Sequence, residues 1–442
     1  MNSLISYWNP IIETLPYKEL KKLQLKKFKR IFNWAYNNSK FHRDLYRENK
    51  ICPDDIQSIE DIRFIPKIDK ELIGKSQNKS PYPYGNSLCV PIEEVTEFHQ
   101  TSGTTGYPLY QADSQTDWEW WAESWAYILW AQGYRPQDKV FIPFGYNQFI
   151  AFWAGHYAAE KIGCEVIPGG ALNTKGRISK IKELLPTAIM GTPTNMLNMA
   201  ETALVKMSID LSSLSVNKIT CAGEPGASIP ATKNRIEKAW GAKVFDHAGA
   251  TEIGAWSYEC ELQPGGLHIN EAFFLVEIED LETGKIINEP GKRGKMIITA
   301  FDRVSQPCIR YDSKDIIEWH DKQCHCGRTF RMIKGGVIGR TDDLIKVKGV
   351  LLSPMTIENI VRSIDSLGDN YEVIVDNNGV TDKITLNVEC FNNTRREYDI
   401  KKLKEVLQLK TNLNFDINAI RHGSLPRYEV KANRVKDLRN LD

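Results

Sequence analysis

The sequence AKVFDHAG, residues 242–249, is a short apolar run that ends at a glycine. Four similar runs precede it, separated by segments with helical patterns: KVFIPF (139–144), CEVIPGG (164–170), AIMGTP (188–193) and KITCAGEP (218–225). Short buried strands that alternate with helices are typical of βαβ units and a mostly parallel sheet. We therefore predict an α/β fold whose ligand site lies beyond the carboxyl ends of these strands, at the sequences TP, GEP and DHAGATE.

The regions after these runs predict further structure. Residues 266–318 contain strand-like runs such as FFLVEIED and KMIITAF between turn sequences, which indicates antiparallel β structure. A break at GGVIGRTDD (335–343) precedes a last segment whose pattern favours a small α+β domain. Because 442 residues are too many for one ordinary compact domain, we expect a large N-terminal domain, residues 1–338, with a β subdomain at 260–338, and a small mobile C-terminal domain, residues 339–442.

The composition indicates a soluble protein. Lys and Arg number 57 against 56 Asp and Glu, so a net charge of +1 predicts neither nucleic acid nor an anionic membrane as a partner. No stretch reaches the roughly 18 apolar residues of a membrane helix, and the first residues lack the pattern of a signal peptide. Nine cysteines, an odd number, argue against a disulfide framework. We expect a cytoplasmic location.

Two segments have patterns with both a plain and a functional interpretation. Residues 17–48 have a helical apolar face and several lysines, for which a solvated surface is favoured over an anionic partner. Five tryptophans lie in a helix-like segment, for which core packing is favoured over a ligand site: Trp118, Trp120, Trp121, Trp125 and Trp130.

The hexapeptide TSGTTG, residues 101–106, has the composition of a phosphate-binding loop. Glycine lets the backbone curl around an anion so that successive N–H groups point inward, and hydroxyl groups add donors. Alone, such a sequence is as often a flexible turn. Here it is followed in order by GTP (191–193), AGEP (222–225), AGATE (248–252), RYDSKD (310–315), GRTDDLIKVKG (339–349) and PRYEVKANRVKD (426–437).

This ordered set resembles the adenylate-forming superfamily, and within it the phenylacetate–coenzyme A ligase-like branch, from about residue 20 to the C-terminus. The resemblance implies that 101–106 hold the β- and γ-phosphates of ATP, that Glu252 helps to bind Mg²⁺, and that Lys431 bridges the substrate carboxylate and the α-phosphate. It implies ribose contacts by Asp315 and Arg340. The implied ATP-binding residues are Thr101, Ser102, Gly103, Thr104, Thr105, Gly106, Gly223, Glu224, Pro225, Asp246, His247, Ala248, Thr251, Asp315 and Arg340.

The resemblance also implies a hinge, an acceptor side and an acyl pocket. Asp342 and Asp343 lie at the junction of the expected domains, where a few residues can absorb a large rotation. One orientation would bring in Lys431, and the other would present Lys346, Lys348 and Gly349 to a thiol acceptor. The acyl pocket is expected at Tyr146, Phe152, Trp153 and Gly249.

The sequence departs from the family pattern at three places. Tyr107 stands where the phosphate loop usually has lysine, so one phosphate-facing cation is missing. Ala248 replaces the usual aromatic residue beside adenine, and His247 or Asp246 is expected to contact adenine instead. Ala151, Phe152 and Trp153 are bulkier than the small residues common in phenylacetate ligases, so we expect a reshaped acyl pocket and do not assume phenylacetate.

Three thiols and one imidazole suit a tetrahedral zinc ion, and relatives in this branch carry a matching EC…GLH…CxCGR pattern. The resemblance thus implies a structural Zn²⁺ held by Cys260, His268, Cys324 and Cys326. His320 and His325 compete for the nitrogen position, and GLH favours His268. The alternative is a set of free buried thiols.

The resulting hypothesis is an enzyme that activates an aromatic or otherwise apolar carboxylic acid with ATP, releases pyrophosphate, and transfers the acyl group to the thiol of coenzyme A. A second hypothesis changes the acceptor to an amine, a carrier-protein thiol or a reductase partner. A third, prompted by Tyr107 and Ala248, is a nucleotide-binding protein without turnover. A small-molecule acid is the expected partner, and a homodimer, a carrier protein or a downstream enzyme is left open.

Overall fold

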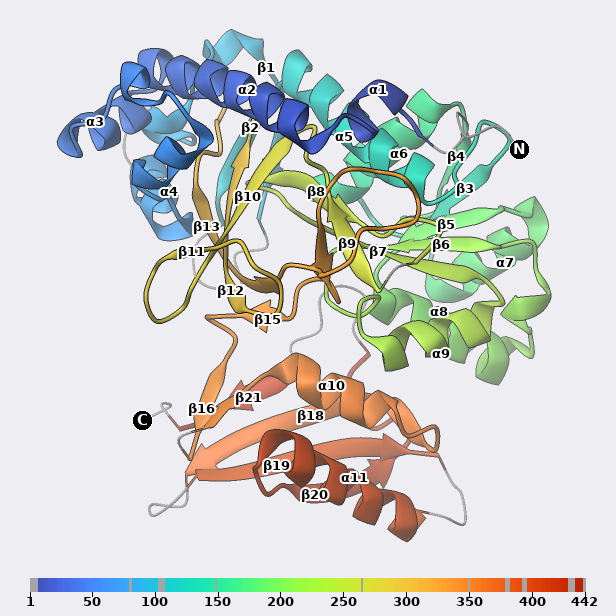
Figure 1. The fold of residues 1–442 in the computed structure, drawn as a ribbon. Coiled ribbons are helices and arrows are strands. Elements are labelled where there is room, and N and C mark those ends of the chain that lie inside the picture. Colours follow the sequence, from blue (N-terminus) through green and yellow to red (C-terminus); the bar gives the residue numbers. More distant parts are fainter. Residues whose placement is uncertain are drawn as a thin grey trace.

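The structure, a computed structural model, describes residues 7–78, 82–101, 108–147, 149–263, 265–348, 350–377, 382–391, 396–427 and 434–439. Figure 1 shows a large N-terminal part above a smaller C-terminal part. An eight-stranded and a five-stranded sheet dominate the large part, and a four-stranded sheet dominates the small one. Within the described ranges, no helix has the length and apolar character that crossing a membrane requires.

The eight-stranded sheet contains all five predicted apolar runs, in the order β14-β9-β8-β7-β6-β5-β3-β4. Its strands are β3 Lys139–Ile142, β4 Glu165–Pro168, β5 Ala188–Gly191, β6 Lys218–Cys221, β7 Lys243–Ala250, β8 Gly254–Tyr258, β9 Gly266–Ile269 and β14 Met332–Lys334. The strands from β4 to β7 pair in parallel, which confirms the predicted α/β fold. By contrast, β8, β9 and β14 extend the sheet through antiparallel pairs.

Helices connect the parallel strands, as the alternation predicts. They are α6 Ile150–Ile162, α7 Thr174–Leu184, α8 Pro193–Met207 and α9 Pro230–Trp240, and α5 Gln115–Ala131 leads from β2 to the first of these strands. The TP sequence after β5 starts α8, because the Thr192 side chain accepts a hydrogen bond from the Asn195 backbone N–H and Pro193 occupies the first turn, where no N–H is needed. This cap directs the chain away from the sheet at the edge where a ligand is expected.

The tryptophans of α5 belong to the core, as expected. Trp118, Trp120, Trp121 and Trp125 are buried, and they pack with the inner faces of α6 and the sheet. Trp130 is half-buried at the end of the helix. The core-packing interpretation is therefore confirmed for this segment.

The five-stranded sheet is antiparallel throughout, as its turn-rich sequence predicts. Its strands are β10 Phe274–Glu279, β11 Ile286–Ile287, β12 Arg293–Ala300, β13 Tyr311–Glu318 and β15 Gly339–Arg340. The two ends of the expected β subdomain, β9 and β14, instead join the eight-stranded sheet. A two-stranded hairpin, β1 Val95–Gln100 with β2 Tyr110–Ser114, flanks the TSGTTG sequence.

The N-terminal stretch 17–48 is helical, as its pattern predicts, and the structure divides it into two helices. The helices of this region are α1 Pro10–Glu13, α2 Tyr17–Asn38, α3 Lys40–Glu48 and α4 Lys70–Gln77. Two short helical turns lie between α3 and α4, η2 Pro53–Asp55 and η3 Ile59–Phe64, and two follow α4, η4 Gly85–Ser87 and η5 Ile92–Glu94. The break falls at Ser39, whose extended backbone ends α2 and whose hydroxyl accepts the His42 N–H at the start of α3. Another such turn, η6 Leu211–Ser213, follows α8.

The small part has its own hydrophobic cluster, drawn from residues between 347 and 415. It contains β16 Ile345–Val347, β17 Val350–Leu352, α10 Pro354–Arg362, β18 Leu367–Asn377, β19 Asp382–Cys390, α11 Arg396–Thr411, β20 Asp416–Arg421 and β21 Val435–Asp437. The four-stranded sheet has the order β20-β19-β18-β21. Since β15 still pairs with β13, the chain leaves the large part just after Arg340. The domain bounds themselves stay a prediction.

Candidate functional site

Residues predicted to surround adenine lie at the carboxyl ends of β6 and β7. Gly223 has a φ of 89°, in the left-handed region that favours glycine. Glu224 then turns back toward β5, where its Oε1 accepts the Thr194 backbone N–H of α8 at 2.7 Å. Burial raises the pKa of the Glu224 carboxyl. The N-terminus of α8 therefore holds Glu224 in place, and Pro225, which follows it, is exposed.

Asp246 and His247 point to opposite faces of β7. Asp246 is buried, accepts a hydrogen bond from the Ser228 hydroxyl and has its pKa raised to about 7 by burial. His247 is also buried, and its Nδ1 lies 2.7 Å from the Ser257 carbonyl oxygen. Burial lowers the pKa of His247 to about 4, so the ring is neutral. Ala248, the next residue, is half-buried.

Glu252 lies beside Tyr311 of β13. The Tyr311 hydroxyl donates to Glu252 Oε1 at 3.5 Å. Burial raises the pKa of Tyr311, and the charges of Glu252, Arg340 and Asp315 also act on it. Tyr311 therefore lies near Glu252 and also near the pair Asp315–Arg340. The sequence motifs that contain these residues are far apart, and the fold brings them to one site.

A buried ion pair that the sequence did not predict supports the segment before Glu252. Arg303 and Asp113 are both fully buried, and Arg303 Nη2 donates to Asp113 Oδ1 at 2.9 Å. Arg303 Nη1 also donates to the Thr251 carbonyl oxygen at 2.6 Å. Asp113 belongs to β2, next to the TSGTTG sequence, so one guanidinium links that hairpin to Thr251 and Glu252. No local sequence signal could have revealed a pair separated by 190 residues.

Asp315, Arg340 and Asp342 form one charged group. Asp315 and Arg340 are register partners on β13 and β15, and Arg340 Nη1 donates to Asp315 Oδ1 at 3.2 Å. The same guanidinium donates to both carboxylate oxygens of Asp342, at 2.9 and 2.8 Å. Burial raises the pKa of Asp315 to about 6, although Arg340 opposes this shift. The expected ribose residue and the expected hinge residue are therefore joined by Arg340, with Asp343 3.8 Å from it.

The residues predicted for the acyl pocket differ in their exposure to solvent. Tyr146 is half-buried, its hydroxyl lies 2.9 Å from His156 Nδ1, and its ring packs against Trp153 with a centroid distance of 4.8 Å. Phe152 points into the core instead, where its ring lies 4.4 Å from that of Phe144 and is 3% exposed. Gly249 is exposed, and a Cβ there would lie 2.9 Å from the Gly254 carbonyl oxygen.

Several predicted residues lie outside the described ranges: Ser102, Gly103, Thr104, Thr105, Gly106, Gly349 and Lys431. Thr101 anchors the start of the phosphate loop, because its backbone N–H donates to the Leu109 carbonyl at 3.0 Å and its hydroxyl accepts the Leu109 N–H at 2.9 Å. On the small part, Lys346 is exposed on β16. The backbone N–H of Lys348 donates to Asp382 Oδ2 at 3.2 Å.

The four predicted zinc ligands lie together. One ligand atom from each of Cys260, His268, Cys324 and Cys326 lies within 4.8 Å of the others. The Sγ atoms of Cys260 and Cys324 are 3.7 Å apart, and Cys326 Sγ is 3.5 Å from His268 Nε2. A tetrahedral ion with Zn–S bonds of about 2.3 Å and Zn–N bonds of about 2.0 Å places its ligand atoms about 3.5–3.8 Å apart. The four side chains therefore fit a zinc ion.

The partners of His268 favour this arrangement over the alternatives. Its other ring nitrogen, Nδ1, lies 3.4 Å from the Phe330 carbonyl oxygen, which directs Nε2 toward Cys326. The competing His320 instead contacts Asp321, 3.2 Å from its Nδ1, and the Lys322 N–H. Of the two histidines, His268 alone is therefore in the cluster found among the described residues.

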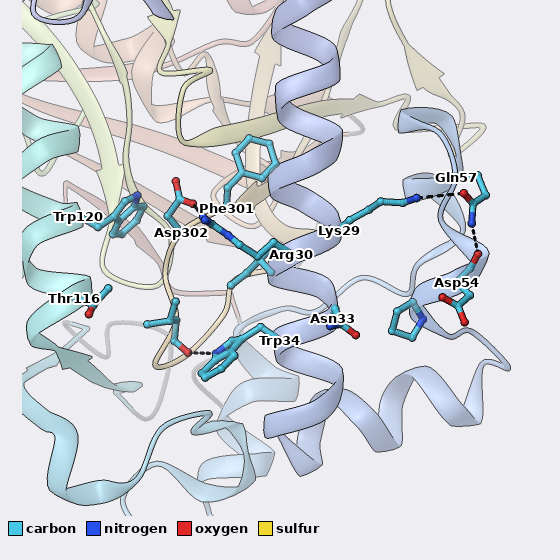
Figure 2. A pocket seen from close by; sticks show the side chains of 13 residues that line it. Lys29, Arg30, Asn33, Trp34, Asp54, Gln57, Thr116, Trp120, Phe301 and Asp302 are labelled. Carbon is cyan, nitrogen blue, oxygen red and sulfur yellow. Dashed lines mark hydrogen bonds and ion pairs between the residues drawn. The ribbon is translucent and has the colours of Figure 1, made fainter.

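A large open groove lies apart from these residues. Figure 2 shows it between α2 and the loop after β12, with a volume of about 810 Å³. Lys29, Arg30, Trp34, Trp120 and Asp302 are among its lining residues. None of the residues predicted for ATP, acyl or metal binding lines it. This groove therefore lies outside the predicted site.

Comparisons with known proteins identify the family of this chain. A family model for the AMP-binding enzyme C-terminal domain matches residues 349–439. The chain is 30% identical to a phenylacetate-coenzyme A ligase from Pseudomonas putida over 436 residues, covering 97% of this chain and 96% of that protein.

Two solved structures of a 2-hydroxyisobutyryl-CoA ligase differ in how well they match. One, in the postadenylation state with R3-HIB-AMP, has a TM-score of 0.93 and 26% identity, covering 99% of this chain and 93% of that one. The other, with 2-HIB-AMP and CoA in the thioesterification state, has a TM-score of 0.75 and 27% identity, with the same coverage. The difference indicates that the two parts of this chain are arranged as in the postadenylation structure. The resemblance drawn from the ordered motifs is confirmed, and the chain belongs to the phenylacetate–coenzyme A ligase branch of the adenylate-forming superfamily, a branch of acid–thiol ligases.

Proposed function

We propose that the protein joins a small carboxylic acid to coenzyme A in two steps. In the first, a carboxylate oxygen attacks the α-phosphorus of ATP, which gives acyl-AMP and pyrophosphate. In the second, the coenzyme A thiol attacks the acyl carbon, loses its proton and displaces AMP. The observation that carries the proposal is the convergence of Glu252, Asp315 and Arg340 around Tyr311, where the chain that follows β7 of the eight-stranded sheet meets β13 of the five-stranded sheet.

Each of these residues has a role that suits its surroundings. Asp315 would accept hydrogen bonds from the ribose hydroxyls, and Arg340 would lie between the ribose and the phosphates. Among the described residues no cation is paired with Glu252, whose contact is the neutral Tyr311 hydroxyl, so its carboxylate fits a hard cation such as Mg²⁺. When bound, that ion would neutralise charge on the triphosphate. Lys431 is proposed to contribute a second positive charge at the α-phosphate.

We also propose that Cys260, His268, Cys324 and Cys326 hold a structural zinc ion. The 3.7 Å and 3.5 Å separations of their ligand atoms support this proposal. Four protein ligands leave no open position for a catalytic water, so the ion would stabilise the fold instead of taking part in the reaction. A cytoplasmic location stays a prediction. The homodimer and the carrier-protein partner stay predictions.

The first half-reaction provides the direct test of the proposed function. Carboxylate-dependent exchange of labelled pyrophosphate into ATP, screened over many acids, should be present in the wild type and fall at least about 100-fold in Lys431→Ala, because a charge that stabilises the transition state is lost. Lys401, exposed on α11, provides a matched control: Lys401→Ala should exchange at the wild-type rate. Equal exchange in Lys431→Ala would rule out the role of this lysine, and no exchange with any acid would contradict the proposed function.

The pKa of Asp315 predicts a pH dependence for ATP binding. This carboxyl titrates at about 6 because it is buried, and ionisation makes both of its oxygens acceptors for the ribose hydroxyls, whereas protonation turns one of them into a donor. ATP affinity should therefore be full well above pH 6 and fall as the pH drops through 6. Asp315→Asn should weaken binding about 10-fold to 100-fold at pH 8 and remove this dependence. Titration calorimetry from pH 5.5 to 8.5 measures both, and an unchanged pH profile in the variant would contradict the assignment.

A further inference from the structure

The face of β7 that carries His247 has a hydrogen-bond acceptor that no described residue uses. A carbonyl oxygen can only accept a hydrogen bond, so the 2.7 Å contact with the Ser257 oxygen places the proton of the His247 ring on Nδ1. The other ring nitrogen, Nε2, then carries a lone pair. Within the described ranges, no donor reaches Nε2, although the side chain is only 5% exposed.

The space beside this nitrogen depends on Gly249, which has no side chain. Residues two apart on a strand lie on the same face, and a Cβ added at Gly249 would come within 3.1 Å of His247 Nε2. Gly249 is exposed, whereas His247 is buried. The absence of a side chain at Gly249 therefore leaves Nε2 open to a ligand that lies against this end of β7.

The surroundings of His247 define the chemistry of that ligand. Its ring lies 4.2 Å from the ring of Trp125, on a face where apolar side chains of α5 and α6 gather. The neighbouring carboxylate, Asp246, is bonded to Ser228 on the opposite face of the strand and cannot neutralise a positive group here. An ammonium group would thus be desolvated without a counter-charge, whereas a hydroxyl would satisfy the acceptor.

We propose that His247 Nε2 is a specificity-determining hydrogen-bond acceptor of the acyl pocket, and that the preferred acid is an otherwise apolar one with a hydroxyl group that donates to it. This inference rests on the proposed function and narrows its substrate class. A wholly apolar acid would bury Nε2 without a partner. A site built around one polar contact discriminates strongly against an analogue that lacks the matching group.

Matched pairs of acids that differ by a hydroxyl in place of a methyl test the inference: 2-hydroxyisobutyrate with pivalate, mandelate with 2-phenylpropanoate, and 3-hydroxyphenylacetate with 3-methylphenylacetate. Wild-type kcat/KM in pyrophosphate exchange should favour the hydroxylated acid of at least one pair by 10-fold or more. His247→Leu should lower kcat/KM for that acid by about 10-fold to 100-fold more than it lowers kcat/KM for its methyl counterpart. His247→Gln, whose amide oxygen can accept at a similar position, should recover part of the preference.

The outcomes separate this inference from the proposed function. If acids support exchange but the methyl members are preferred throughout, the inference is wrong and the proposed function stands. The inference is also wrong, and the proposed function stands, if His247→Leu lowers kcat/KM equally for both acids of a pair, since a specific acceptor binds only the hydroxylated acid. Exchange with no acid at all would overturn both. Thermal unfolding of each variant identifies any loss that comes from the fold.

Discussion

Replacing Cys324 by serine is expected to abolish the proposed zinc site and lower the free energy of unfolding by roughly 4 kcal/mol or more, because a structural ion contributes its binding energy directly to folding. Cys260, His268, Cys324 and Cys326 connect β9 with two loops, so the ion would close this end of the eight-stranded sheet. Elemental analysis of the purified wild type should give close to one zinc per chain, and Cys324→Ser should give almost none. Thermal and denaturant unfolding measure the loss of stability.

A second buried thiol provides the control. Cys164 is buried outside the cluster, and its Sγ donates to the Arg135 carbonyl oxygen at 3.3 Å, a bond that a serine hydroxyl can replace. Cys164→Ser should therefore keep both its zinc and nearly all of its stability. A wild-type protein without zinc, together with a Cys324→Ser variant as stable as the wild type, would show that the four residues are free thiols.

Replacing Arg235 by alanine is expected to slow adenylation about 10-fold to 100-fold while leaving the fold intact. Arg235 of α9 reaches across to the small part, where it caps the end of α10. It donates to the carbonyl oxygens of Arg362, Ile364 and Leu367 at 2.8, 2.7 and 3.1 Å, and to Asp369 Oδ1 at 2.6 Å. Carbonyls at a helix end lack partners within the helix, so the guanidinium satisfies them and meets the negative end of the dipole.

This contact belongs to one orientation of the two parts. Figure 1 shows α9 directly above α10. A second contact supports it, because Arg362 Nη1 donates to the Thr232 hydroxyl of α9 at 2.8 Å. The orientation corresponds to the postadenylation relative, with a TM-score of 0.93, better than to the thioesterification one, with 0.75. Loss of several hydrogen bonds at about 1 kcal/mol each would disfavour the orientation seen here relative to the other one.

Separate assays of the two half-reactions measure this shift. Arg235→Ala should reduce pyrophosphate exchange, whereas transfer from preformed acyl-AMP to coenzyme A should be unchanged or faster. Arg235→Lys, which keeps the charge but loses the planar fork, should be intermediate. Lys238, exposed on the same helix, is the matched control, and Lys238→Ala should behave as the wild type. Equal slowing of both half-reactions would argue against a role in orientation, as would normal exchange in Arg235→Ala.

Much of the fold could be predicted because it depends on short-range patterns. Apolar runs that end in TP and GEP indicate parallel strands, and Thr192 with Pro193 indicates the helix that follows. The helical character of 17–48 was also predicted, but its break at Ser39 was not, since the apolar periodicity continues through Ser39, where the side-chain cap starts a new helix. Apolar periodicity predicts which side of a helix is buried. It does not locate a break, because one polar capping residue can end one helix and begin the next.

The sequence by itself determined the chemistry available to this protein: the order of its motifs, the thiols and imidazole that suit zinc, and the glycine beside the expected acyl group. Only the tertiary structure decided which of these groups are free to act. In the folded protein, Asp113 pairs with Arg303, 190 residues away in the sequence, and the Phe152 ring packs in the core. His247 Nδ1 donates to a carbonyl oxygen, so Nε2 is left as an acceptor. The reason is physical: hydrogen-bond partners and burial set protonation and access, and both arise between residues that are distant along the chain.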